Sequence, residues 1–148
     1  MKPTNATMGK FGYPDSLIKQ YDKWVLLLRP QQVTLGSLVL VCLEEAKAFS
    51  AISTDSFVDL SLVIREVETN LTEAFSYEKI NYLMLMMVDP DVHFHIIPRY
   101  ATSQEFHNQQ FFDHGWPGPP DLKMTNETSK VTQLELQGFL KNTWKSLA

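Results

Sequence analysis

The apolar positions of this 148-residue chain fall into short continuous runs and one long periodic stretch. Residues 24–29 and 38–43 are nearly unbroken apolar runs, which is typical of strands covered on both faces. Residues 17–21 predict a shorter strand before them. Residues 80–87 predict another strand, and the connection over 88–90 is short. We therefore expect this strand to pair antiparallel with the segment that follows it.

The strongest helical pattern runs from residue 53 to residue 75, where apolar side chains recur every three or four positions. These side chains are Phe57, Leu60, Ile64, Val67, Leu71, Ala74 and Phe75. Capping of this helix is expected from Thr54 or from residues 56–59. The stripe predicts packing of the helix against the sheet.

The remaining segments are less regular. Residues 1–14 predict a flexible lead-in, and residues 103–112 predict a short helix. Residues 121–148 predict a helical extension, with a closing helix over 132–147. Helical and strand patterns that alternate in this way predict one α+β domain over residues 1–148.

Composition narrows the class of protein. The net charge of −4 argues against broad binding of a nucleic-acid backbone, which needs a basic surface. No apolar run approaches the roughly 20 residues needed to span a bilayer, and the first nine residues lack the apolar core of a signal peptide. With Cys42 as the only cysteine, we expect a reduced, cytoplasmic setting and a buried thiol.

The candidate chemistry lies in residues 91–100, which alternate between two faces of a predicted strand. Apolar residues occupy one face. Asp91, His93 and His95 occupy the other. A neutral imidazole is a nucleophile and a proton carrier near physiological pH, so this row predicts either nucleophilic catalysis or metal binding.

Geometry makes the metal hypothesis the weaker of the two. Asp91 and His95 lie roughly 13 Å apart along a straight strand, so one ion could take His93 and His95 but hardly Asp91 as well. Structural zinc sites usually recruit thiolates, and only one is present. Further ligands would have to come from the following loop, which offers His107, Asp113 and His114.

Residues 93–99, with the sequence HFHIIPR, resemble the motif of the histidine triad (HIT) superfamily of nucleotidyl hydrolases and transferases. That motif has three histidines alternating with apolar residues, often followed by Pro-Arg. Aligned on the Pro-Arg end, His93 corresponds to the middle, nucleophilic histidine and His95 to the third. Asp91 stands where the first histidine would be, which is one departure from the pattern. Met86 and Met87, in a place where relatives often have polar residues near the phosphates, are another.

The likeness covers roughly residues 15–120, including the runs over 24–32, 36–41 and 80–83. It implies a HIT-like α+β fold: an antiparallel sheet of about five strands, with one long helix and a C-terminal helix packed on it. It also implies pairing into a homodimer, with no cofactor.

The resemblance further implies an enzyme that cleaves a nucleoside polyphosphate, such as a diadenosine polyphosphate, or a nucleoside phosphoramidate at the α-phosphate. His93 would attack the phosphorus and form a nucleotidyl-histidine intermediate, and His95 would hold a non-bridging oxygen. Asp91 would act behind the imidazoles, because a carboxylate near phosphate oxygens is repelled. Asn81 and Arg99 are candidates for substrate binding.

Two alternatives stay open. Asp91 and the Met86-Met87 pair favour a nucleotide-binding or regulatory protein with reduced or lost turnover. A metal-dependent hydrolase using His93 and His95 is the second alternative.

Overall fold

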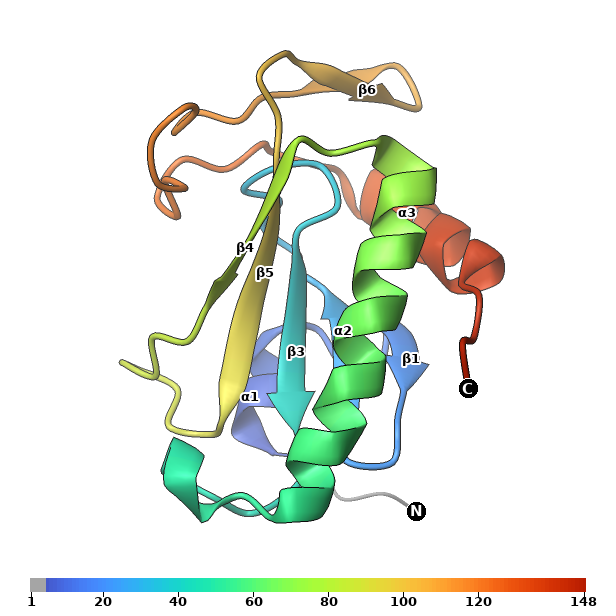
Figure 1. Cartoon of the computed structure of the whole chain (residues 1–148). Helices are drawn as coiled ribbons and strands as arrows, with labels where there is room; N and C mark the ends of the chain where they lie inside the picture. Colours follow the sequence, from blue (N-terminus) through green and yellow to red (C-terminus); the bar gives the residue numbers. More distant parts are fainter. Residues whose placement is uncertain (1–4) are drawn as a thin grey trace.

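The computed structural model describes residues 5–148. Figure 1 shows the course of the chain, in which runs of consecutive strands lie between the α-helices. The elements are α1 (Ala6–Lys10), β1 (Leu17–Gln20), β2 (Trp24–Leu28), β3 (Leu38–Cys42), the 3-10 turn η1 (Phe49–Ala51), α2 (Thr54–Phe75), β4 (Lys79–Leu83), β5 (His93–Arg99), β6 (Gln104–Phe106), β7 (Gln109–Phe111) and α3 (Lys130–Thr143).

Five strands form one antiparallel sheet in the order β1-β2-β3-β5-β4. Strand β5, which carries both imidazoles, is therefore internal, between β3 and β4. His93 lies opposite Val41, and His95 lies opposite Val39 and Leu83. The predicted five-stranded antiparallel sheet is confirmed.

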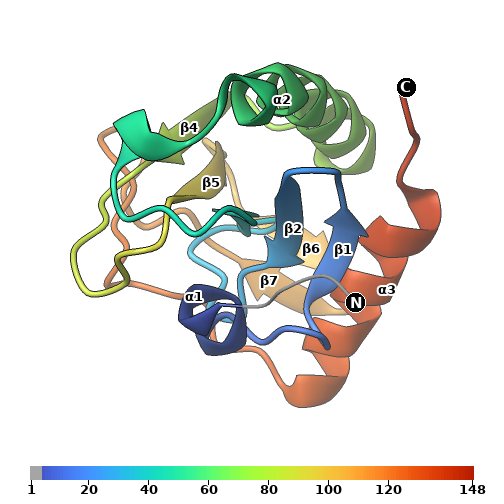
Figure 2. The same cartoon turned by 90° about the horizontal axis from the view of Figure 1, so that it is seen from below.

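Helices cover the two faces of the sheet unequally (Figure 2). The long helix α2 packs over the face that carries Leu26, Leu40 and Ile96, where the main core lies. The short helix α1 lies on the opposite face, where Met8 and Phe11 pack on a smaller apolar cluster. This second cluster consists of those two side chains with Val25, Leu27, Val39 and Val41. Because side chains alternate along a strand, His93 and His95 belong to the face beneath α1.

The N-terminal segment differs from its prediction. From residue 5 onward it is not a loose lead-in, because Asn5 caps helix α1 and Met8 is buried against the sheet. Residues 1–4 of the predicted lead-in lie outside the described residues. The prediction was wrong for α1 because five residues are too few to show helical periodicity.

Helix α2 is confirmed, with two corrections. Its N-cap is Ser53, whose side chain accepts a hydrogen bond from the amide of Ser56. Phe57 is exposed and lies beside Phe49, with the ring centroids 5.4 Å apart, so it is not part of the buried stripe. The buried face of the helix instead includes polar Glu66 and Asn70.

Two predictions after α2 were wrong. The strand predicted over 80–87 ends at Leu83, and a loop follows in which Met86 has φ of 46°, a left-handed conformation that cannot continue a strand. The helix predicted over 103–112 is a hairpin of β6 and β7. Its two turn residues, His107 and Asn108, have φ of 47° and 65°, and positive φ at both positions is typical of tight hairpin turns.

The closing helix is confirmed as α3, although it begins at Lys130 and ends at Thr143. It lies beside β1 at one edge of the sheet (Figure 2). None of the helices within residues 5–148 is both long and apolar enough to cross a membrane.

Candidate active site at the start of strand β5

A cavity of about 260 Å³ lies over the first half of β5, and both imidazoles line it. The rest of its wall is formed by Lys10 and Phe11, by Arg29 and Gln31, by residues 85–89 and by Leu122. The cavity therefore joins the end of α1, the end of β2 and the loop between β4 and β5. It is the place where the predicted chemistry would occur.

His93 has a tautomer fixed by the backbone. Its Nδ1 lies 2.6 Å from the carbonyl oxygen of Asp91, and a carbonyl oxygen only accepts hydrogen bonds. Nδ1 therefore carries the proton and donates it. In the neutral ring, Nε2 then keeps its lone pair, which is the electronic state that a nucleophilic imidazole needs.

His95 has the opposite arrangement. Its Nδ1 accepts a long hydrogen bond of 3.5 Å from Nε of Arg29, so the neutral ring carries its proton on Nε2. Burial lowers the pKa of His95 to about 4, and the charge of Arg29 and the neighbouring His93 act in the same direction. His95 is therefore neutral at physiological pH and is a hydrogen-bond donor.

The two rings lie close together. Their centroids are 5.3 Å apart, and the centroid of the Phe11 ring is 5.5 Å from that of His95. One imidazole with a free lone pair and one with an N–H donor line the same cavity. A tetrahedral oxyanion such as a phosphoryl group fits this pairing, because its central atom accepts a nucleophile and its oxygens accept hydrogen bonds.

Asp91 does not line the cavity. Strand β5 begins at His93, so the predicted alternation does not extend back to Asp91. Its buried carboxylate accepts hydrogen bonds from Thr7 Oγ1 at 2.9 Å and from Lys47 Nζ at 2.5 Å. Burial alone would raise the pKa of Asp91, but these two hydrogen bonds outweigh it and hold the pKa below its ordinary value. Its hydrogen bond to His93 runs through its backbone carbonyl, not through the carboxylate.

Asn81 and Arg99 are brought together, but not with the imidazoles. The Arg99 guanidinium makes a two-pronged ion pair with Asp113, through Nε at 2.7 Å and Nη2 at 3.0 Å. Its Nη1 donates to Oδ1 of Asn81 at 2.8 Å. Neither residue lines the cavity at His93. All three guanidinium nitrogens of Arg99 therefore already have protein partners.

The ligands that a metal site would need are elsewhere. Asp113 is engaged by Arg99, and His107 on the β6–β7 turn pairs with Glu135 of α3. Across residues 5–148, no three side chains of His, Cys, Asp or Glu come together in a way that could hold a metal ion. Two neighbouring imidazoles are too few for a protein zinc site.

Sequence reasoning missed Arg29, Lys10 and Phe11. Arg29 could have been found from strand register: Leu27 lies opposite Val39, which lies opposite His95, so Arg29 two residues on is on the same face. No comparable signal marks Lys10 and Phe11, because they reach the site only through the packing of α1.

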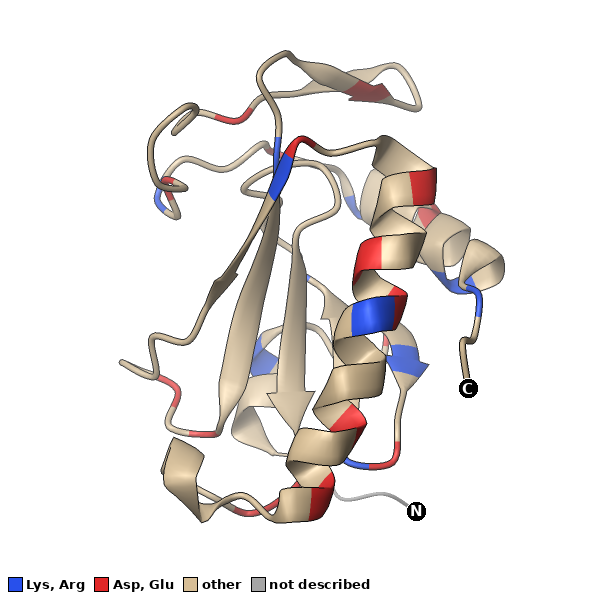
Figure 3. Ribbon diagram, in the orientation of Figure 1, with Lys and Arg blue, Asp and Glu red and all other residues tan. Residues whose placement is uncertain are grey.

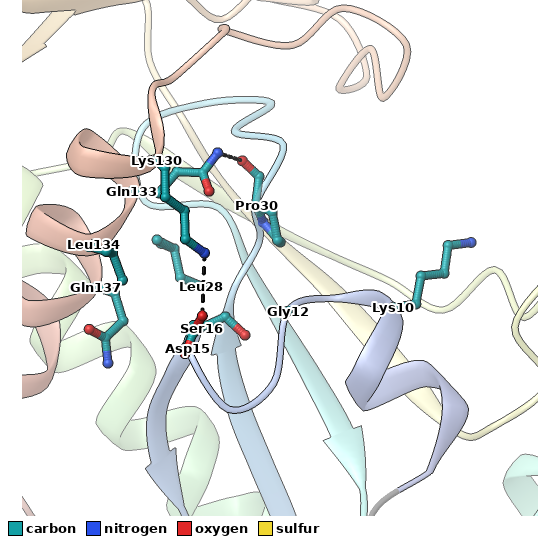
Figure 4. A pocket seen from close by; sticks show the side chains of 10 residues that line it. All are labelled: Lys10, Gly12, Asp15, Ser16, Leu28, Pro30, Lys130, Gln133, Leu134 and Gln137. Atoms are coloured by element: carbon teal, nitrogen blue, oxygen red, sulfur yellow. Dashed lines mark hydrogen bonds and ion pairs between the residues drawn. The ribbon is translucent and has the colours of Figure 1, made fainter.

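A second cavity, of about 180 Å³, lies between α3 and the turn that follows α1 (Figure 4). It contains no imidazole or thiol, and its polar side chains have protein partners. Lys130 lies 3.5 Å from Asp15, and Gln133 donates to the carbonyl oxygen of Pro30 at 3.3 Å (Figure 4). The cavity at His93 is therefore the better candidate for chemistry.

No protein-family model matches the sequence, and no curated protein matches it. Solved structures do match. A histidine triad protein from Marinobacter aquaeolei VT8 superposes with a TM-score of 0.74 at 18% identity, covering 100% of this chain and 99% of that one. A histidine triad protein from Bradyrhizobium japonicum gives 0.71 at 20% identity, covering 95% and 94%.

The similar structures include an enzyme. Diadenosine triphosphate hydrolase from Plasmodium falciparum, solved in complex with Cyclomarin A, gives a TM-score of 0.64 at 13% identity, covering 87% of this chain and 76% of that one. At these identities the likeness concerns backbone architecture. The chain has the fold of the histidine triad proteins.

Proposed function

We propose that this protein is a member of the histidine triad family that hydrolyses or transfers nucleotidyl groups, with His93 as its nucleophile. One observation carries the proposal. The backbone carbonyl of Asp91 holds the proton of His93 on Nδ1, so the neutral ring has its lone pair on Nε2, and His93 lines the same cavity as the N–H donor His95. The similarity of the fold to a diadenosine triphosphate hydrolase supports a nucleoside polyphosphate as substrate.

The proposed reaction has two steps. In the first, the lone pair of His93 Nε2 forms a bond to the α-phosphorus, and the bond from phosphorus to the leaving group breaks. The carbonyl oxygen of Asp91 stabilises the positive charge that this places on the ring, through the Nδ1 proton. In the second step, water attacks the phosphorus and releases a proton to solvent. The N–P bond breaks with its electron pair returning to Nε2, which regenerates His93.

His95 stabilises the charge that builds on the phosphoryl oxygens. Its Nε2–H is available because Arg29 occupies Nδ1, and burial keeps the ring neutral to about pH 4. A donor aimed at a developing oxyanion is typically worth about 3 kcal/mol, or roughly a hundredfold in rate. The two imidazoles thus divide the work between nucleophile and donor.

The test uses diadenosine triphosphate and an adenosine phosphoramidate as substrates, with products followed by chromatography. We expect the His93→Ala variant to lose turnover completely. Quenching the wild-type reaction with alkaline denaturant, in which a histidine P–N bond survives, should trap a nucleotide bound to the protein. The matched control is His114→Ala, since His114 does not line the cavity. Equal turnover by wild type and His93→Ala would refute the proposal.

A nucleotide-binding protein without turnover is the second candidate. The loop over residues 85–89 favours it, because it lines the cavity with Leu85, Met86, Met87 and Val88 and supplies no polar side chain except Asp89. For this candidate, calorimetry would detect binding of adenosine monophosphate while neither substrate is consumed and no nucleotidyl-protein is trapped.

We also propose that the protein is a homodimer. Strand β4 is an edge strand of the sheet, and an unpaired edge is a template for strand pairing. The loop that follows it exposes Leu85, Met87 and Val88. Light scattering coupled to size-exclusion chromatography is expected to give twice the 17.0 kDa mass of one chain, and the mass of a single chain would contradict the proposal.

A further inference from the structure

Arg29 is a cation at the active-site cavity whose described partners include no carboxylate. The other basic side chain that lines the cavity is paired, because Nζ of Lys10 lies 2.7 Å from Oδ2 of Asp89. The partners of Arg29 are uncharged. They are the backbone carbonyl of Gln31, which accepts from Nη1 at 2.7 Å, and Nδ1 of His95.

The guanidinium is nevertheless held in place. Its carbon lies 5.9 Å from the centre of the Phe11 ring, a cation–π distance, and Nε and Nη1 are fixed by His95 and Gln31. Within the described part of the chain, Nη2 has no hydrogen-bond acceptor. A partly buried charge without a counter-ion is costly, and an anionic ligand would offset that cost.

The charges that line the cavity also favour an anionic ligand. Its lining contains two cations, Lys10 and Arg29, and one carboxylate, Asp89, so with neutral imidazoles it carries a net positive charge. The chain as a whole has a charge of −4. Many acidic residues lie along α2, which covers the opposite face of the sheet (Figure 3). The positive charge is therefore confined to the cavity, while the protein as a whole is acidic.

We propose that Arg29 binds a second phosphate of the substrate, next to the phosphoryl group that His93 attacks. Its guanidinium would take the oxygens of the leaving phosphate, where negative charge grows as the P–O bond breaks. The protein would then prefer phosphoanhydrides, whose leaving group is anionic, over phosphoramidates of uncharged amines. This inference rests on the proposed function and selects between the two substrate classes that it leaves open.

The test compares the two classes in the Arg29→Met variant. We expect kcat/KM for diadenosine triphosphate to fall by roughly 10- to 100-fold, the usual effect of losing a hydrogen bond to a charged group. For an adenosine phosphoramidate we expect a smaller fall, because its leaving group carries no charge for the guanidinium to bind and only the contact of Arg29 with His95 is lost. Arg65→Met is the matched control, because Arg65 is exposed on α2 and donates to the carbonyl of Ser61 in its own helix. Arg29→Lys keeps the charge without the planar fork, so its kcat/KM for diadenosine triphosphate should lie between those of the wild type and Arg29→Met.

Calorimetry provides a second readout that needs no turnover. Arg29→Met is expected to weaken binding of adenosine diphosphate about tenfold more than binding of adenosine monophosphate, as expected when one charged hydrogen bond is lost. An equal loss for both nucleotides, or for both substrates, would overturn the inference, because Arg29 would then act only through His95 or the nucleoside. If the wild-type protein shows no turnover, the proposed function fails while the comparison of nucleotides still decides the role of Arg29.

Discussion

At the scale of single residues, the site depends on what each imidazole nitrogen contacts. His93 and His95 are two residues apart on one strand and face the same cavity. A carbonyl oxygen at Nδ1 makes His93 a lone-pair donor at Nε2, whereas a guanidinium at Nδ1 makes His95 a proton donor at Nε2. Two identical side chains therefore acquire different chemistry from their partners.

His95 predicts a pH dependence of stability. Its pKa is about 4 in the folded protein and about 6.5 when unfolded, so the unfolded chain binds the proton more tightly between these values. The free energy of unfolding should therefore fall as pH drops from about 6.5 to about 4, by about 2–3 kcal/mol. Urea unfolding at several pH values measures this. His95→Gln should remove the loss, and His114→Gln, away from the cavity, should keep it.

The buried contact between Asp91 and Thr7 predicts how a substitution of Thr7 changes stability. Replacing Thr7 by Val removes the hydroxyl that donates to the buried carboxylate at 2.9 Å. The expected cost is about 1–3 kcal/mol in the free energy of unfolding. Thr143→Val is the control, since its exposed hydroxyl donates to a carbonyl of its own helix, and it should change stability by less than about 0.5 kcal/mol. Equal stability of the two variants would contradict the buried contact.

At the scale of elements, the turn between β2 and β3 has a requirement that one glycine meets. Gly36 has φ of +87°, and a Cβ at this position would lie 2.8 Å from the ring of Phe75 at the end of α2. Both the backbone conformation and the close approach exclude a side chain. The turn and the end of the helix are therefore coupled.

Gly36→Ala should therefore lower the free energy of unfolding by about 1–3 kcal/mol, because it adds backbone strain to a steric overlap. Gly138→Ala is the opposite case. Gly138 lies within α3, where an added Cβ would have nothing within 4 Å, and alanine there should raise stability by up to about 1 kcal/mol. Thermal unfolding of both variants measures the difference in sign.

At the scale of the whole molecule, Glu66 joins three segments. Its carboxylate, on the sheet-facing side of α2, is fully buried and accepts hydrogen bonds from Lys19 at 2.8 Å, Tyr21 at 2.7 Å and Trp144 at 3.2 Å. The amide of Leu147 donates to its other oxygen at 2.9 Å. The long helix, the first hairpin and the C-terminal residues thus meet at one charge.

Glu66→Ala should destabilise the protein by about 3–5 kcal/mol, because it leaves several buried donors without an acceptor. Glu73→Ala removes an exposed partner of Lys145 and should cost less than about 1 kcal/mol. Chemical denaturation with both fluorescence and circular dichroism gives the two values. If Glu66→Ala lowered the free energy of unfolding as little as Glu73→Ala, the hydrogen-bond network around Glu66 would contribute little to stability.

Much of the fold was predictable because its elements are long or strongly apolar. The runs over β2 and β3 and the periodicity of α2 are local properties, so they appear in the sequence. The β6–β7 hairpin and α1 were not predicted, because three- and five-residue elements are too short to show a period. The loop after Leu83 has the apolar sequence of a strand, but Met84 and Met86 pack partly against the core while Leu85, Met87 and Val88 are exposed.

The sequence by itself determined the pair of imidazoles on one face of a strand, since that depends only on the alternation of side chains. Tertiary structure decided what surrounds them. Thr7 reaches Asp91 across 84 positions, and Arg29 reaches His95 across 66. Such contacts depend on how strands pair and on where α1 packs, and no local pattern encodes either one. The alternating residues of the strand predicted a site, and the fold supplied the partners that give His93 and His95 different chemistry.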